Sequence, residues 1–320
     1  MPLFFFCSGF FYQDITTRDN ALSFVKKKFV GLYSPFVKWS VLFLLLHNLL
    51  LNWGIYNAYC GYYGGSSFYS FKDIMTNFGL ILFTMHGYEE LLGGFWFIRA
   101  LFVSSLLIVI ISILLRSIIK YKYEIVCLLL FVMTVLIRRF APDTDFWWDI
   151  SMGTLGAVFY LMGFLLKQYE FVWQNSACAF FCCIPLLFSF FYFKDTVGMG
   201  CGYNKVFLFS ISAVTGSLLT LYLSKYIEKK IEFIKNVLYY IGNHTFVILA
   251  LHFLSFRFVS LGIVILYGFD VVHIAEHPVI MNPPIINSYW WIVYSIVGII
   301  FPLFFNSVWQ IIFNFISRKG

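Results

Sequence analysis

The chain has 320 residues, of which 61% are hydrophobic and only 12% are charged, and its mean hydropathy is +0.84. A typical soluble domain is about 25% charged, and a fold of this length cannot bury so many apolar side chains, because a large part of its surface must face water. This composition excludes a soluble globular protein. The net charge of +7 does not indicate nucleic-acid binding, because Lys and Arg flank the apolar segments, where topology signals lie.

Long stretches without charge indicate membrane-spanning helices. Residues 171–193, 206–224 and 278–317 contain no Asp, Glu, Lys or Arg, and about 20 apolar residues suffice for one span. The stretches are continuously apolar rather than alternating, which predicts helices and not barrel strands. We therefore predict an all-α, polytopic transmembrane helix bundle that forms a single domain over residues 1–320. Nine spans are predicted, at residues 1–12, 36–52, 95–115, 123–139, 147–166, 175–193, 205–224, 244–268 and 289–315.

The distribution of Lys and Arg predicts the orientation. If the spans alternate, the basic segments 18–28, 116–122 and 225–235 and the C-terminus share one side, which is therefore cytoplasmic. Residues 53–94 and 269–288 are then outer segments. Within the first of them, residues 78–85 are too few to span and predict a re-entrant or interfacial piece. Residues 225–238 predict a basic amphipathic helix on the cytoplasmic surface.

Ionisable side chains inside predicted spans are candidates for function, because they are costly in a bilayer. Arg99 either snorkels to the outer headgroups or contacts a buried substrate or partner, and Trp96 lies on the same helix face. Arg257 falls near mid-membrane and is expected to face a polar cavity or a carboxylate. His252 and His47 are a base, a ligand or packing residues, and packing is favoured for both.

Two charged clusters lie at predicted span ends. Lys26, Lys27 and Lys28 serve either as a topology signal that attracts anionic lipid or as a landing site for a phosphorylated cytosolic ligand. The aspartates at 143, 145 and 149 lie close to Arg138 and Arg139 in sequence and predict an ion-pair network. No Cys-x-x-Cys pair is present, so no metal site is predicted.

Four sequence blocks, in this order, resemble acyltransferase family 3, the bacterial membrane-bound O-acyltransferases. They are residues 1–11 (MPLFFFCSGFF), 26–36 (KKKFVGLYSPF), 95–102 (FWFIRALF) and 241–252 (IGNHTFVILALH). The first is similar to the family's second helix, which is Phe-rich and ends in Ser-Gly-aromatic, here with Ser8. The others are similar to the basic loop before the next helix, the start of the fourth helix and a late helix.

The resemblance implies a ten-span protein of the bacterial cytoplasmic membrane that transfers an acyl group, commonly acetyl, from acyl-CoA to a hydroxyl of a cell-surface glycan. It implies that Lys26, Lys27 and Lys28 contact the donor's phosphates and that Trp96 and Arg99 line the acceptor side of a pore. Further candidates for that side are Ser8, His252 and Arg257. The expected partners are membrane lipids, acyl-CoA and a glycan or lipid-linked saccharide, with no bound cofactor and no nucleic acid.

The family's catalytic His lies in its first helix, whereas this chain begins at a segment similar to the second. That His is therefore expected upstream of Met1, no catalytic residue is predicted within the chain, and the activity of this form is in question. The alternative function is a transporter or flippase for a polar solute or lipid-linked sugar, suggested by His252 and Arg257 at membrane depth. The absence of an internal repeat in the sequence disfavours it. A non-catalytic membrane subunit is a third reading.

Overall fold

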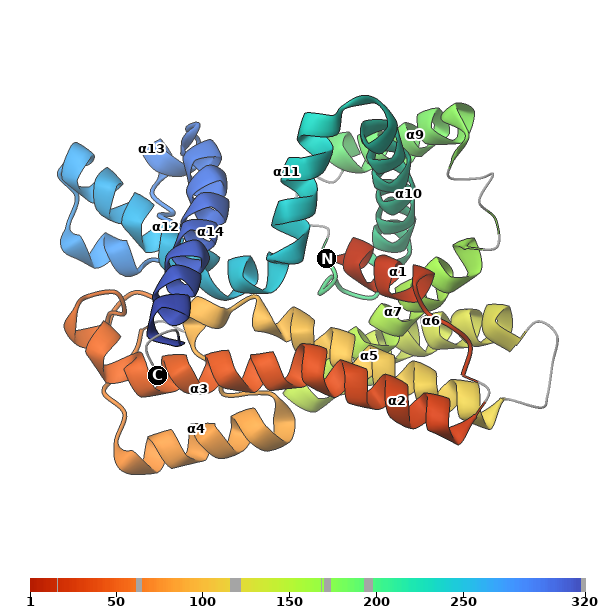
Figure 1. Cartoon of the computed structure of the whole chain (residues 1–320), viewed down its shortest axis with the longest axis horizontal. Helices are drawn as coiled ribbons and strands as arrows, with labels where there is room; N and C mark the ends of the chain where they lie inside the picture. The colour runs from red at the N-terminus through yellow and green to blue at the C-terminus, as the bar shows by residue number, and fades with distance from the viewer. Residues whose placement is uncertain are drawn as a thin grey trace. The chain divides into compact units, whose positions relative to one another are not determined.

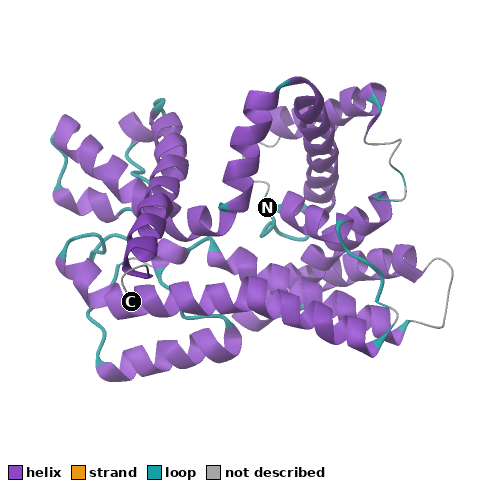
Figure 2. Ribbon diagram, viewed as in Figure 1, coloured by secondary structure: helices purple, strands orange, loops and turns teal. Residues whose placement is uncertain are grey.

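A computed structural model describes residues 1–15, 17–61, 65–115, 122–167, 169, 174–192 and 198–317 (Figure 1). These residues form helices and connecting loops and contain no strand (Figure 2). Four of the basic residues that predicted the orientation, Arg116, Lys120, Arg318 and Lys319, lie outside the described part of the chain.

Sixteen helical segments run along the described chain. They are α1 (Pro2–Phe10), α2 (Arg18–Lys28), η1 (Phe29–Tyr33), α3 (Ser34–Asn52), α4 (Phe71–Thr84), η2 (Glu90–Leu92), α5 (Phe95–Leu114), α6 (Lys122–Phe140), α7 (Asp145–Leu166), α9 (Ser176–Tyr192), α10 (Val206–Lys230), α11 (Glu232–Asn243), α12 (Thr245–Tyr267), η3 (Val271–Ala275), α13 (Pro283–Ile286) and α14 (Trp290–Ser317).

Every predicted span contains a helix, and six helices in the described residues are long and apolar enough to cross a membrane. The six are the continuous helix Arg18–Asn52 and helices α5, α7, α10, α12 and α14. Of the other three predicted spans, α1 has only 9 residues and α9 has 17. Helix α6 has 19 residues but carries charged side chains in its first and last turns. The chain is thus an all-α, multi-pass membrane protein.

The segment before the second predicted span is helical and not a loop. Thr17 caps α2 by accepting a hydrogen bond from the backbone N–H of Asn20 at 3.2 Å, which satisfies one of the N–H groups that a helix start leaves open. Helix α2 then continues through the π-helical turn η1 into α3, so that 35 residues form one continuous helical segment. The three lysines therefore lie on a helix surface.

Two surface helices differ from their predicted extents. Helix α4 has 14 residues and begins at a capping box made by Ser70 and Asp73, so it extends further than residues 78–85 but is still too short to span. The predicted amphipathic helix at 225–238 is divided at Ile231, whose backbone leaves the helical region (φ −135°, ψ 79°). Its first part belongs to α10 and its second part to α11.

The helices form two compact units, each made from two stretches of chain. Unit 1 comprises Met1–Tyr33 and Phe97–Lys235, and unit 2 comprises Ser34–Trp96 and Asn236–Gly320. Helix α5 begins in unit 2 and continues in unit 1. The single domain over residues 1–320 stays a prediction.

Unit 1 is held together by the close approach of α1 to α7. A β-carbon at Gly9 would lie 1.7 Å from the carbonyl oxygen of Tyr160, and one at Gly163 would lie 2.0 Å from that of Phe6. Both glycines therefore let two backbones touch, as small residues do at helix interfaces in membranes. Tyr12, just after α1, is buried beside them and hydrogen-bonds the Ser112 hydroxyl at 2.8 Å.

Unit 2 is built around α12 and α14. Its core consists of Val259, Ile263 and Val264 of α12, Ile280 and Ile285 of the following segment, and Tyr294 of α14. The segment between α12 and α14, predicted as an outer loop, thus packs its apolar side chains against both helices. Ile280 is fully buried there, so this segment contributes to the core, although Val271, Met281 and Ile286 remain exposed.

Candidate functional site

Arg99 of α5 forms an ion pair with Asp149 of α7 inside unit 1. Its residue exposure is only 9%, so it is buried in protein and does not snorkel to headgroups. Asp149, one of the aspartates in the predicted ion-pair network, thus pairs with a cation that the prediction did not include. Arg138 donates to the Ser151 hydroxyl at 2.6 Å. It also donates to the carbonyl groups of Met199 and Cys201, each at 2.7 Å.

Two of the three clustered lysines line a cavity of about 590 Å³ in unit 1. Lys27 and Lys28 of α2 line it, together with polar residues that are close to them in the sequence, such as Gln13 and Asn20. Lys26 is exposed and does not line it. The Lys28 ammonium lies 5.2 Å from the ring centroid of Phe24 and 5.8 Å from that of Tyr160, which are cation–π distances.

The positive charge of this cavity is not cancelled from within. Asp14 is the one carboxylate among its described lining residues. Asp14 accepts a hydrogen bond from the Tyr123 hydroxyl and lies 3.3 Å from the Lys122 ammonium. Because that carboxylate already has a cation and a donor, Lys27 and Lys28 give the cavity a net positive field, which suits an anionic ligand.

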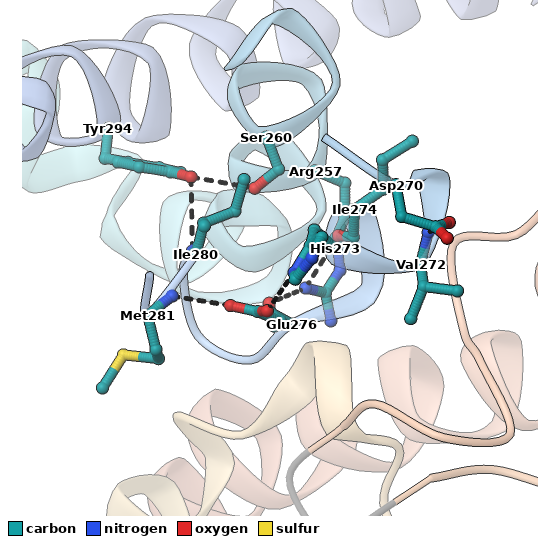
Figure 3. A network of polar contacts seen from close by, with 10 residues as sticks. All are labelled: Arg257, Ser260, Asp270, Val272, His273, Ile274, Glu276, Ile280, Met281 and Tyr294. Carbon is teal, nitrogen blue, oxygen red and sulfur yellow. Dashed lines mark hydrogen bonds and ion pairs between the residues drawn. The ribbon is translucent and has the colours of Figure 1, made fainter. Parts of the chain in front are cut away.

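Arg257 is the centre of a polar network in unit 2 (Figure 3). Its exposure is 3%, and its guanidinium forms an ion pair of 2.5 Å with Glu90. It also donates to the carbonyl of Ile274 at 3.2 Å and to that of Glu276. The prediction that Arg257 faces a carboxylate is confirmed, and the carboxylate is Glu90.

The segment after α12 folds back deep along that helix. Arg257 lies ten residues, or about 15 Å at 1.5 Å per residue, before the end of α12 at Tyr267. The ring of His277 lies 4.6 Å from that of Phe253, which is a further turn down the helix. Glu276 fixes this return, because its carboxylate contacts His273 and accepts from the Met281 N–H at 2.6 Å (Figure 3).

His47 of α3 is held as a cation by its surroundings. Its Nδ1 lies 2.7 Å from the Glu89 carboxylate and its Nε2 lies 2.9 Å from the carbonyl of Ser67. Both neighbours are hydrogen-bond acceptors, so both ring nitrogens must carry protons to satisfy them. The ring also stacks on the ring of Tyr69, with the two ring centroids 3.5 Å apart. Burial, and then the Glu89 charge, raise the pKa of Tyr69 to about 12. His47 is therefore a structural ion-pair partner in this arrangement and not a free base.

His252 of α12 carries the opposite chemistry. Its Nδ1 lies 2.9 Å from the carbonyl of Leu249, so Nδ1 carries a proton and donates it to that carbonyl. The ring packs against Phe253 and Phe256, as the packing interpretation predicts. A β-carbon at Gly94 would lie 3.5 Å from its Cε1.

The buried His277 is expected to make the folding stability of the protein sensitive to acid. Burial lowers its pKa to about 4, and the charge of Arg257 acts in the same direction. Its pKa in the unfolded chain is about 6.5, so between these values the unfolded state binds a proton that the folded state does not. Stability therefore falls as the pH drops from about 6.5 towards 4. We expect His277→Gln to flatten this loss in melting curves recorded over that pH range.

The matched control for this prediction is His244→Gln, at the N-cap position before α12. It should keep the wild-type pH dependence, because the hydrogen bond between the Nδ1 of His244 and the Tyr240 carbonyl of α11, 2.8 Å long, is solvent-exposed. If the melting temperature falls equally with pH in wild type and in His277→Gln, the assignment of the acid sensitivity to His277 is contradicted.

The predicted site residues divide between the units. Ser8 and Arg99 belong to unit 1 with Lys26, Lys27 and Lys28, and Trp96, His252 and Arg257 belong to unit 2. Ser8 and Trp96 are half-buried. The contributions of Glu276 and His277 were not predicted, although residues 269–288 hold acidic side chains and no Lys or Arg. An acidic segment next to a helix with a buried cation was the available signal.

Within the described residues, no three His, Cys, Asp or Glu side chains are grouped to hold a metal ion. Comparison with known proteins gives one family match. The family profile, described as an acyltransferase domain, matches residues 1–315. No curated protein and no solved structure matches the chain.

Proposed function

This chain belongs to acyltransferase family 3, and from that premise we propose that it is a membrane-bound O-acyltransferase. Its donor is acyl-CoA, carrying acetyl or another acyl group, and its acceptor is a hydroxyl of a cell-surface glycan or lipid-linked saccharide. The acceptor oxygen attacks the thioester carbonyl carbon, the carbon–sulfur bond breaks, and the hydroxyl proton passes to the CoA thiolate. The proposed location is the bacterial cytoplasmic membrane, with the C-terminus in the cytoplasm.

The observation that carries this proposal is the cavity lined by Lys27 and Lys28. Its volume of about 590 Å³ lies within the range of small-molecule and cofactor sites. Lysine ammonium groups bind phosphates as point charges, and acyl-CoA presents several phosphates at the end remote from its thioester. The basic segment 18–28 is on the predicted cytoplasmic side, where acyl-CoA is made.

On the acceptor side, we assign His252 the contact with the acceptor hydroxyl, because the Leu249 carbonyl occupies its Nδ1 and this leaves Nε2 for that contact. Trp96 and Arg99 remain proposed acceptor-side residues from the family resemblance. The transporter interpretation rests on His252 and Arg257 at membrane depth. The ion pair of Arg257 with Glu90 gives that cation a structural role, which weakens this half of the argument.

Removal of the two cavity lysines tests the proposed donor site. We expect Lys27→Gln with Lys28→Gln to weaken acyl-CoA binding roughly 10- to 100-fold, since each lost phosphate contact is worth about 1 kcal/mol or more. The measurement is binding of radiolabelled acetyl-CoA to the protein in lipid nanodiscs. Transfer of the label to membrane glycan is then followed in the same preparation.

The matched control is Lys26→Gln, which removes the same charge from a residue that does not line the cavity. It should change the dissociation constant by no more than about twofold. Equal weakening by both changes would show a general charge effect and contradict the site. Absence of acyl-CoA binding to the wild-type protein would contradict the proposed function itself.

A further inference from the structure

A second cavity of about 290 Å³ lies in unit 1 between the end of α1 and the last turns of α10. Its α1 side is formed by Cys7, Phe10 and Phe11, and its α10 side begins with Leu221. The remaining lining residues of α10 are Ser224, Lys225 and Glu228. The spacing 221, 224, 225 and 228 is one face of a helix, so a single stripe of α10 closes the cavity.

The two cavities have one lining residue in common. Phe11 lines both this cavity and the larger one that contains Lys27 and Lys28. The larger cavity is polar and cationic, whereas the smaller one is walled mainly by apolar side chains. One ligand that spans both would need charged groups at one end and an apolar group at the other. Acyl-CoA has this polarity, with its phosphates at one end and its acyl chain at the other.

We propose that the smaller cavity is the acyl subsite of the donor, and that Leu221 sets the length of acyl chain it accepts. This inference rests on the proposed function, because it takes acyl-CoA as the ligand of the larger cavity. The volume equals that of about ten water molecules at ~30 Å³ each, so an acetyl group leaves most of it unfilled. The natural acyl group is therefore longer than acetyl.

The expected signature is a dependence on chain length. Each methylene that enters the cavity leaves water, which predicts a gain of about fourfold in kcat/KM per methylene until the cavity is full. The assay compares acetyl-, butyryl-, hexanoyl- and octanoyl-CoA as donors for the full chain in nanodiscs. Wild type should prefer a donor longer than acetyl-CoA.

Two substitutions at Leu221 change the space in opposite directions. Leu221→Trp fills the cavity, and the ratio of kcat/KM for hexanoyl- over acetyl-CoA should fall at least tenfold. Leu221→Ala enlarges it, and the preferred donor should become longer. The control is Leu223→Trp, which adds the same bulk to α10 at an exposed position that does not line the cavity. It should leave the donor profile unchanged.

Three results would overturn the acyl subsite. They are an unaltered donor profile in both Leu221 variants, the same shift in Leu223→Trp, and a co-purified phospholipid that Leu221→Trp displaces without any change of donor preference. In each case wild type still binds and uses acyl-CoA. A wild-type protein that binds no acyl-CoA fails the proposed function instead, so the two failures are distinguishable.

Discussion

Replacing Arg257 with Met is expected to lower the free energy of unfolding by about 3–5 kcal/mol, because it leaves the Glu90 carboxylate buried without its cation. The Glu90 side chain is only 9% exposed. The same change removes the donor to the carbonyl groups of Ile274 and Glu276, which hold the returning segment against α12. The measurement is unfolding of the purified protein in mixed detergent micelles.

A second substitution separates the ion pair from the loss of packing. Arg257→Met combined with Glu90→Met replaces both charges by apolar chains of similar length, and such replacement of a whole buried pair is often neutral or stabilising. We expect the double variant to recover at least half of the loss, with a positive coupling in the mutant cycle. Lys72→Gln, on the exposed face of α4 in the same unit, should have no measurable effect. Additive losses at residues 257 and 90 would contradict the pairing.

Replacing Gly163 with Leu is expected to prevent α1 from packing on α7. A β-carbon at this position would lie 2.0 Å from the Phe6 carbonyl oxygen, a distance that only a backbone shift relieves. Overpacking of side chains typically costs 1–3 kcal/mol, and a clash with backbone in a helix interface costs more. The result should be loss of folded protein by size-exclusion chromatography, together with proteolytic cleavage in the segment after α1.

Gly216→Ala is the control for this prediction. Its β-carbon would meet the Leu186 side chain at 3.7 Å, which is ordinary contact, and Ala is the better helix former. We expect this variant to be as stable as wild type or slightly more so. Retention of normal folding by Gly163→Leu would show that α1 and α7 do not approach as closely as described.

The sequence predicts that the buried charged residues need partners, but it does not identify those partners. A cation at mid-membrane has to meet an anion or polar groups, whatever the fold, so it was predictable that Arg257 faces a polar cavity or a carboxylate. The identity of the partner was not, because Glu90 is 167 residues away in sequence. The roles of the two histidines could not be decided from the sequence either. Only their neighbours distinguish His47, with acceptors on both nitrogens, from His252, with one.

The sequence by itself determined that this protein is a bundle of membrane helices. Whether a segment can cross a bilayer depends on its own length and apolarity, which are local properties. It also determined the order of blocks that matches the acyltransferase family. Only the tertiary structure decided that α2 continues into α3, that the segment after α12 returns to Arg257, and that Phe11 lines two cavities. Each of these depends on which surfaces pack together, and packing between distant segments leaves no periodic trace in either segment alone.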